Sequence, residues 1–287
     1  MPNSVEPPSE SPTRLAAAYA LLAADEQWTP LAGGTDLMVQ MTGEIGEPPD
    51  RILDIWGLDE LRGISVEADR LLIGALTTYA ELRRSAVVAE VLPALGDAAA
   101  TIGAAQIQNR GTIGGNVVNA SPAGDTLPVL LASDAVFVLG SARGEREVAA
   151  DAFWTGYRTT ARRPDELLLR VEIPITPSRQ VRFRKIGTRR AQAISKVVMA
   201  LSWRSPADAD WTDVRLALGS VAATTVRAKK TESALDGSRP TPDVADAAVA
   251  ALMSELSPID DVRSSADYRR LVAGRVLHRL IRDGGNW

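Results

Sequence analysis

The chain has 287 residues, of which 45% are apolar and 24% are charged. Its 32 basic and 36 acidic residues give a net charge of −4, so it lacks the basic excess typical of nucleic-acid binding. It contains no cysteine, which excludes disulfides, iron–sulfur clusters, zinc ribbons and cysteine nucleophiles from this chain. With a single histidine, His278, it also lacks multi-histidine metal sites, so any redox chemistry must rely on an organic cofactor.

The N-terminal region predicts a disordered tail, residues 1–10, followed by a short amphipathic helix. Ser11 and Pro12 fit an N-cap followed by proline at the first helical position. The longest apolar run near the start, residues 15–24, is too short to cross a bilayer, and no basic segment precedes it as in a signal peptide. We therefore expect a cytoplasmic protein without a membrane span.

Strands and helices then alternate along the chain. Apolar and β-branched runs predict strands at 51–55, 71–74, 135–139 and 166–173. Helices are predicted at 79–84, 91–102 and 121–132. The first of these helices opens with Thr78-x-x-Glu81, the pattern of a capping box. The mixture of elements favours an α+β fold up to a linker at residues 174–178.

The part beyond the linker predicts a smaller domain. Three strands lie close together in the sequence, which favours an antiparallel meander, and two helices follow them. The strands are expected at 180–186, 194–203 and 213–218, and the helices at 242–256 and 266–282. The last helix has Tyr268, Val272, Val276 and Leu280 at every fourth position, an amphipathic stripe.

Two double-glycine segments are the strongest candidates for ligand binding. They are Ala32-Gly33-Gly34-Thr35-Asp36-Leu37 and Thr112-Ile113-Gly114-Gly115-Asn116. Glycine permits positive φ and lets backbone N–H groups approach a ligand, and rows of such groups bind diphosphates. Neither segment matches a Rossmann or Walker A pattern, and one double glycine is more often a tight turn. Two such segments in one chain, each flanked by Thr, Asp or Asn, make a simple turn and a ligand site about equally good interpretations.

Three other polar residues have more than one interpretation. Asp125 lies at the expected start of a helix, where a carboxylate either complements the helix dipole or accepts hydrogen bonds from ribityl or sugar hydroxyls. Lys185 shares a strand face with Phe183, which is typical of an exposed strand cation. His278 in the last helix indicates a helix-surface or capping residue rather than a catalytic one.

These segments together resemble the FAD-binding medium subunit of the molybdenum hydroxylases, the group that includes the flavoproteins of xanthine dehydrogenase and carbon monoxide dehydrogenase. The resemblance rests on residues 32–37, 112–116, 119–125, 165–174 and 183–190, and it covers nearly the whole chain after residue 12. It implies a two-part FAD-binding domain of the vanillyl-alcohol-oxidase-like (PCMH) type, residues 11–177. A C-terminal flavoprotein domain with a small three-stranded antiparallel sheet and helices, residues 178–287, would follow.

The resemblance also implies which residues contact FAD. The first glycine segment would wrap the diphosphate and the second would pack along the diphosphate and ribityl from the other side. Asp125 and Lys185 would reach the flavin, and Ile194 would shield the isoalloxazine ring. The full expected set is Leu31, Ala32, Gly33, Gly34, Thr35, Asp36, Leu37, Thr112, Ile113, Gly114, Gly115, Asn116, Asp125, Leu168, Lys185 and Ile194. No catalytic residue and no metal ligand is expected.

The implied function is that of an FAD-carrying electron-transfer subunit in a molybdopterin-dependent dehydrogenase. A molybdopterin-binding large subunit would oxidise the substrate, an iron–sulfur small subunit would carry single electrons through [2Fe-2S] clusters, and FAD would pass them to a small-molecule acceptor. The absence of cysteine agrees with clusters on other chains. The alternatives are a standalone FAD-dependent oxidase, whose flavin often carries a His, Tyr or Cys attachment, and a scaffold that has lost its cofactor.

Two stretches depart from the better-known relatives. Xanthine dehydrogenase relatives carry acidic residues just before the position of Ile194, where this chain has Arg190-Ala-Gln-Ala193, so the resemblance does not imply NAD as acceptor. Thr35-Asp36 replaces a His-Ser pair of the carbon monoxide dehydrogenases. The expected substrate of the complex is therefore a purine, another N-heterocycle or an aldehyde rather than carbon monoxide.

Overall fold

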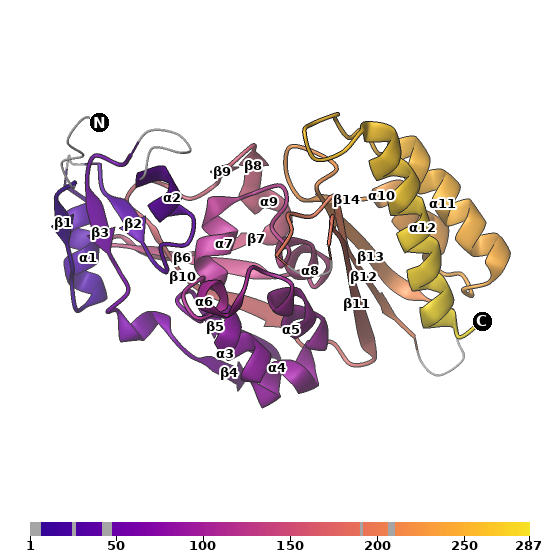
Figure 1. Ribbon diagram of the computed structural model, residues 1–287. Helices are drawn as coiled ribbons and strands as arrows, with labels where there is room; N and C mark the ends of the chain where they lie inside the picture. Colours follow the sequence, from indigo (N-terminus) through magenta and orange to yellow (C-terminus); the bar gives the residue numbers. More distant parts are fainter. Residues whose placement is uncertain (1–6, 25–26, 42–47, 190–191, 206–209) are drawn as a thin grey trace.

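The computed structural model describes residues 7–24, 27–41, 48–189, 192–205 and 210–287. Its N-terminal part is a small parallel sheet in the order β1-β3-β2, formed by β1 (Ser9–Glu10), β3 (Ile52–Asp54) and β2 (Thr29–Leu31). Helix α1 (Leu15–Leu22) lies close to this sheet (Figure 1). It buries Ala18 and Leu22 in the same small core as Leu53. Helix α2 (Leu37–Met41) and the 3-10 helix η1 (Asp59–Leu61) complete this part.

Two predictions for the N-terminal region are wrong within the described residues. Ser9 and Glu10 are not part of a disordered tail, because they pair with β3 and the N–H of Ile52 donates to the carbonyl of Pro8 at 2.8 Å. Helix α1 begins at Leu15 with Arg14 as N-cap, and not at Pro12. Residues 1–6 of the expected tail lie outside the described residues.

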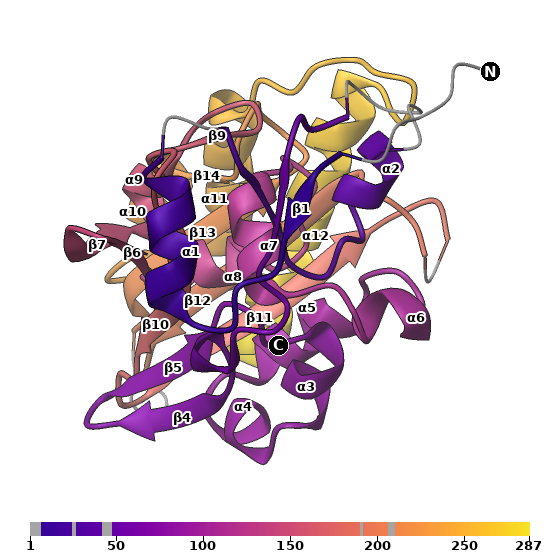
Figure 2. The same ribbon diagram turned by 90° about the vertical axis from the view of Figure 1, so that its left-hand side faces the viewer.

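A five-stranded antiparallel sheet forms the second part, in the order β4-β5-β10-β6-β7. Its strands are β4 (Ile64–Glu67), β5 (Arg70–Gly74), β6 (Val136–Ser141), β7 (Gly144–Ala149) and β10 (Leu167–Pro174). Helices join it in one large core: α3 (Tyr79–Arg84), α4 (Ala86–Val91), α5 (Pro93–Ala100), α7 (Ile113–Asn119), α8 (Leu127–Ala132) and α9 (Ala150–Phe153). The short helix α6 (Ala105–Gln108) lies against α3 outside this core. A hairpin of β8 (Trp154–Gly156) and β9 (Thr159–Thr160) leads back to β10. Figure 2 views the molecule from this N-terminal side.

The strand predictions for this part are confirmed, and so is the capping box. The Thr78 side chain accepts a hydrogen bond from the Glu81 N–H at 3.2 Å, and the Glu81 carboxylate accepts one from the Thr78 N–H at 2.7 Å. The predicted helix 91–102 is instead two helices, because Pro93 has no N–H and disfavours helical geometry at Leu92, whose φ and ψ are −145° and 66°. The predicted helix 121–132 begins only at Leu127, since turns occupy residues 121–126.

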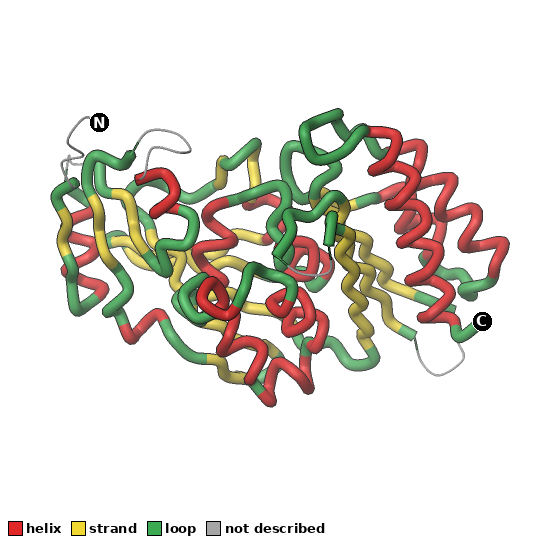
Figure 3. Tube along the Cα trace, in the orientation of Figure 1, coloured by secondary structure: helices red, strands yellow, loops and turns green. Residues whose placement is uncertain are grey.

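The C-terminal part is an antiparallel sheet covered by helices. Strands β11 (Arg179–Ile186), β12 (Val197–Arg204) and β13 (Thr212–Gly219) form the predicted meander, and a short fourth strand, β14 (Val226–Arg227), extends the expected three-stranded sheet. One face packs against α10 (Lys229–Leu235), α11 (Pro242–Glu255) and α12 (Ala266–Gly285). The other face packs against α5 and α8, so this sheet lies between two groups of helices (Figures 1 and 3). No helix within the described ranges is long and apolar enough to cross a membrane.

Candidate functional site

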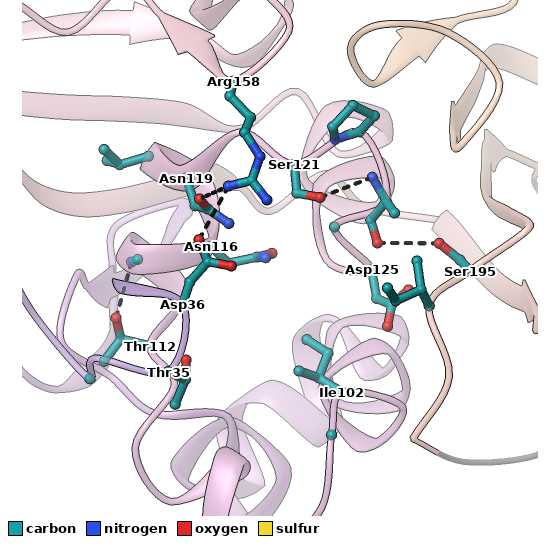
Figure 4. Close-up of a pocket in the computed structure, with 18 of the residues that line it drawn as sticks. Thr35, Asp36, Ile102, Thr112, Asn116, Asn119, Ser121, Asp125, Arg158 and Ser195 are labelled. Carbon is teal, nitrogen blue, oxygen red and sulfur yellow. Dashed lines mark hydrogen bonds and ion pairs between the residues drawn. The ribbon is translucent and has the colours of Figure 1, made fainter. Parts of the chain in front are cut away.

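A large cavity of about 1210 Å³ lies where the N-terminal parts meet the C-terminal sheet. Its walls come from the segment after β2, the start of α7, the turns at 121–125 and the hairpin turn at 157–158. On the C-terminal side, residues 192–195 and 220–223 complete it. Figure 4 shows Thr35, Asp36 and Thr112 on one side of the open space, with Asp125 and Ser195 opposite. The volume exceeds the roughly 300–1,000 Å³ of most small-molecule sites, which fits a ligand as long as a dinucleotide.

The first glycine segment lines the cavity with unpaired backbone donors. Within the described residues, no hydrogen bond is recorded for the N–H groups of Gly33, Gly34, Thr35 or Asp36. Gly34 has φ +75°, a conformation that glycine adopts at little cost. At Gly33, a Cβ would lie 1.8 Å from the carbonyl oxygen of Arg110, so only glycine fits there. Successive free N–H groups at a cavity wall are a ready site for an anion such as a diphosphate.

The second glycine segment is not a loop between elements. It forms the beginning of helix α7, with Thr112 as the N-cap. The N–H groups of Ile113 and Gly114 donate to the carbonyls of Thr77 and Ala75, both at 2.9 Å, and that of Gly115 donates to Thr112 Oγ1 at 3.0 Å. A Cβ on Gly114 would lie 2.6 Å from the Ala75 carbonyl oxygen. At Gly114 and Gly115 this segment therefore offers a wall without side chains rather than a row of free donors.

Asp125 and Lys185 form a buried ion pair at the opposite wall. Lys185 Nζ lies 2.5 Å from Asp125 Oδ2 and 3.2 Å from the Thr101 carbonyl oxygen, and Thr101 Oγ1 donates to the same carboxylate oxygen at 3.1 Å. Asp125 Oδ1 is buried with no partner among the described residues. Burial raises the pKa of the Asp125 carboxyl, although the charge and hydrogen bond of Lys185 act in the opposite direction. The expectation of an exposed strand cation at Lys185 is wrong, because its side chain is only 11% exposed.

Removing the Lys185 ammonium should destabilise the protein in a pH-dependent way. In Lys185→Met, burial acts on Asp125 without the paired cation, so its folded-state pKa rises further above the unfolded value of about 3.9. The stability that such a group contributes is complete below the unfolded pKa and is lost as the pH rises through the folded pKa. We expect a loss of about 3–5 kcal/mol at neutral pH, shrinking in acid.

Urea unfolding of the wild type and of Lys185→Met, without added ligand, measures the difference in the free energy of unfolding. It should be carried out in mildly acidic and in mildly alkaline buffer. Lys229→Met is the matched control, because the Lys229 side chain is 65% exposed. An equal loss for Lys185→Met at both pH values would contradict the assignment to Asp125.

The structure brings almost all expected site residues to one cavity. The lining includes Leu31, Ala32, Gly33, Gly34, Thr35, Asp36, Leu37, Thr112, Gly114, Gly115, Asn116, Asp125, Leu168, Lys185 and Ile194. Ile113 is the exception, because its side chain is fully buried in the core. Ile194 is 55% exposed at the C-terminal side. In the departing stretch before it, residues 190 and 191 lie outside the described residues.

Several cavity residues carry no signal in the sequence. Tyr79 is buried beside the cavity, and burial together with the charges of Asp125 and Asp36 raises its pKa. Ser195 Oγ and Ser220 Oγ lie 2.8 Å apart, and Ser195 Oγ also donates to the Ala123 carbonyl oxygen at 3.2 Å (Figure 4). Arg158 reaches the cavity from the hairpin turn. These residues are far apart in the chain, so no local pattern could have grouped them.

His278 lies away from this cavity. Its ring is 3.7 Å from Asp246 and contacts Trp287 edge to face, in agreement with the predicted helix-surface position. Among the described residues, no group of three or more His, Asp or Glu side chains could hold a metal ion.

Comparisons with known proteins now identify the family. The FAD-binding domain of molybdopterin dehydrogenases matches residues 6–176, and the CO dehydrogenase flavoprotein C-terminal domain matches residues 182–283. The chain belongs to the family of FAD-binding medium subunits of the molybdenum hydroxylases. The predicted family, fold class, cofactor and general function are therefore confirmed, and a standalone oxidase is not favoured.

Relatives with different substrates in their names resemble the chain to a similar degree. It is 33% identical to the glyceraldehyde dehydrogenase medium chain of Sulfolobus acidocaldarius, over 89% of this chain and 90% of that one. It is 31% identical to the nicotine 6-hydroxylase medium subunit of Paenarthrobacter nicotinovorans, over 96% of both chains. In three dimensions it matches carbon monoxide dehydrogenase from Hydrogenophaga pseudoflava with a TM-score of 0.90 and 32% identity, over 95% of both chains.

Proposed function

We propose that the chain binds FAD in the cavity between its two domains, residues 11–177 and 178–287. The diphosphate would lie against the free N–H groups of Gly33, Gly34, Thr35 and Asp36, next to the first turn of α7 on the same side of the cavity. Asp125, held by Lys185, would accept a hydrogen bond from the flavin or its ribityl chain. Leu168 would pack on the cofactor and Ile194 would limit access to the ring. The unpaired N–H row on one wall of a dinucleotide-sized cavity is the observation that carries this assignment.

The described residues fit this cofactor on two further grounds. Asp125 Oδ1 is a buried acceptor without a partner, and a hydrogen-bond donor of the ligand would relieve the cost of leaving it unsatisfied. Gly33 and Gly34 allow the backbone to approach the ligand where any side chain would clash or adopt a strained conformation.

The chain would act within a three-subunit complex. We propose an iron–sulfur small subunit and a molybdopterin-binding large subunit as partners, a small-molecule electron acceptor, and a cytoplasmic location. Bound FAD supplies the exchange between single electrons from a cluster and electron pairs for the acceptor. The residues of this chain bind the cofactor, orient it and control access to it. An aldehyde or N-heterocycle remains our proposed substrate class for the complex, on the basis of Thr35-Asp36.

Titration of the flavin-free chain with FAD tests this function. We expect saturable binding of one FAD per chain, and all of the flavin released into the supernatant on acid precipitation, because no cysteine is present and His278 lies away from the cavity. Absorbance of supernatant and pellet measures the release. A chain that fails to bind FAD, or that keeps a yellow pellet, would contradict the proposal.

A further inference from the structure

Arg158 connects the two glycine segments through a single guanidinium. It lies in the turn between β8 and β9 and has a left-handed backbone, with φ +52°. Its Nη1 donates hydrogen bonds to Oδ2 of Asp36 at 3.2 Å and to Oδ1 of Asn119 at 2.7 Å. Asp36 belongs to the first glycine segment, and Asn119 is the last residue of α7, which contains the second (Figure 4).

Part of the Arg158 guanidinium is still available to a ligand. In the part of the chain that the structure describes, no hydrogen bond is recorded for its Nε or Nη2. The side chain lines the cavity and is 35% exposed. A guanidinium presents five N–H donors in a planar fork that matches the oxygens of a phosphate, so three donors remain after those used by Asp36 and Asn119.

Other cations along the described cavity wall have protein partners at a distance from the glycine segments. Lys185 is paired with Asp125. Arg162 donates through Nη1 to backbone carbonyls, including that of Glu166 at 2.7 Å. Arg269 contacts Asp261 and the Ser220 carbonyl. Arg263 lies 3.6 Å from the same Asp261, and Arg189 donates to the Gln192 carbonyl. Arg158 is thus the lining cation that is in place to act on a ligand held by the first glycine segment.

We propose that Arg158 is the counter-ion of the FAD diphosphate and the residue that makes the cavity favour the dinucleotide over a flavin without a diphosphate. This inference rests on the proposed FAD site. Asp36 brings a negative charge to the segment where the diphosphate would lie, and an unneutralised carboxylate there would repel it. Arg158 neutralises that carboxylate through Nη1 and offers Nη2 and Nε to the phosphate oxygens. The same contacts hold the first glycine segment and α7 at a fixed separation.

Binding titrations of the full-length, flavin-free chain test this role. Arg158→Ala should weaken the binding of FAD and of ADP by a similar factor, about 10- to 100-fold, because both ligands lose charge-assisted hydrogen bonds. The affinity for riboflavin, which has no phosphate, should change by less than about twofold. Arg158→Lys should recover part of the loss, since the charge remains and the fork is lost. Arg163→Ala, in the same segment but outside the cavity lining, should match the wild type.

Salt dependence separates a counter-ion from a residue that only braces the walls. Wild-type affinity for FAD should fall as salt increases, and the fall should be shallower in Arg158→Ala. Unchanged FAD and ADP affinity in Arg158→Ala would overturn the inference, and so would a loss with the wild-type salt dependence. If Arg158→Ala fails to fold, Arg158→Gln, which removes the charge but keeps a long polar side chain, decides by the same criteria. A wild-type chain that binds no FAD would instead refute the proposed function itself.

Discussion

We expect the Gly33→Ala variant to bind FAD about 100-fold or more weakly and so to retain almost no cofactor. The added Cβ cannot be accommodated without moving the first glycine segment. The added carbon would lie 1.8 Å from the Arg110 carbonyl oxygen and 2.5 Å from its carbon, both of them backbone atoms. To relieve this overlap, the segment that carries the free N–H row must shift away from Arg110. The donors at residues 33–36 would then no longer converge on one anion.

Two other glycines provide a graded test of this expectation. Gly34→Ala should have a smaller effect, since φ +75° costs a residue with a Cβ about 1–2 kcal/mol. Gly57→Ala is the control, because its Cβ meets nothing within 4 Å. Flavin absorbance per protein after desalting measures occupancy, and circular dichroism checks the fold. Full occupancy in Gly33→Ala would show that this segment does not hold the cofactor.

Local signals predicted the elements whose causes are local. The apolar run before Gly74, the Thr78–Glu81 capping box and the closely spaced strands of the C-terminal meander all depend on neighbouring residues. Elements that depend on distant partners were missed. Strand β1 exists because Ser9 and Glu10 find the edge of β3, more than forty residues away in the chain, and β14 depends on its pairing with β13 and on contacts with α8.

The candidate site shows the same division. The glycine segments are visible in the sequence, but only the fold distinguishes the free N–H row at Gly33 and Gly34 from the satisfied first turn at Gly114 and Gly115. Resemblance to the family singled out Asp125 and Lys185, yet the residues alone favoured an exposed lysine. Their pairing arises because β11 packs beside α5 and the turn at 125, which no spacing rule could indicate.

The other large effect concerns the partner subunits. We propose that the substrate is oxidised on a partner subunit and not on this chain, which has no cysteine and whose described residues offer no metal-binding group. Purified alone and loaded with FAD, it should leave the flavin oxidised during incubation with aldehydes and N-heterocycles. Co-purified with the proposed iron–sulfur and molybdopterin-binding subunits, it should show substrate-dependent bleaching of the flavin absorbance within the enzyme's turnover time.

The Gly33→Ala chain supplies the decisive control in that complex. If FAD on this subunit is the exit for electrons, a complex assembled with the variant should still reduce its clusters with substrate but should not pass electrons to an acceptor dye at the flavin. Cluster bleaching without dye reduction therefore locates the defect in this chain rather than in assembly. Flavin reduction by substrate in the isolated chain would have the opposite meaning: a standalone oxidase, whose substrate site would have to lie in the same cavity as the cofactor.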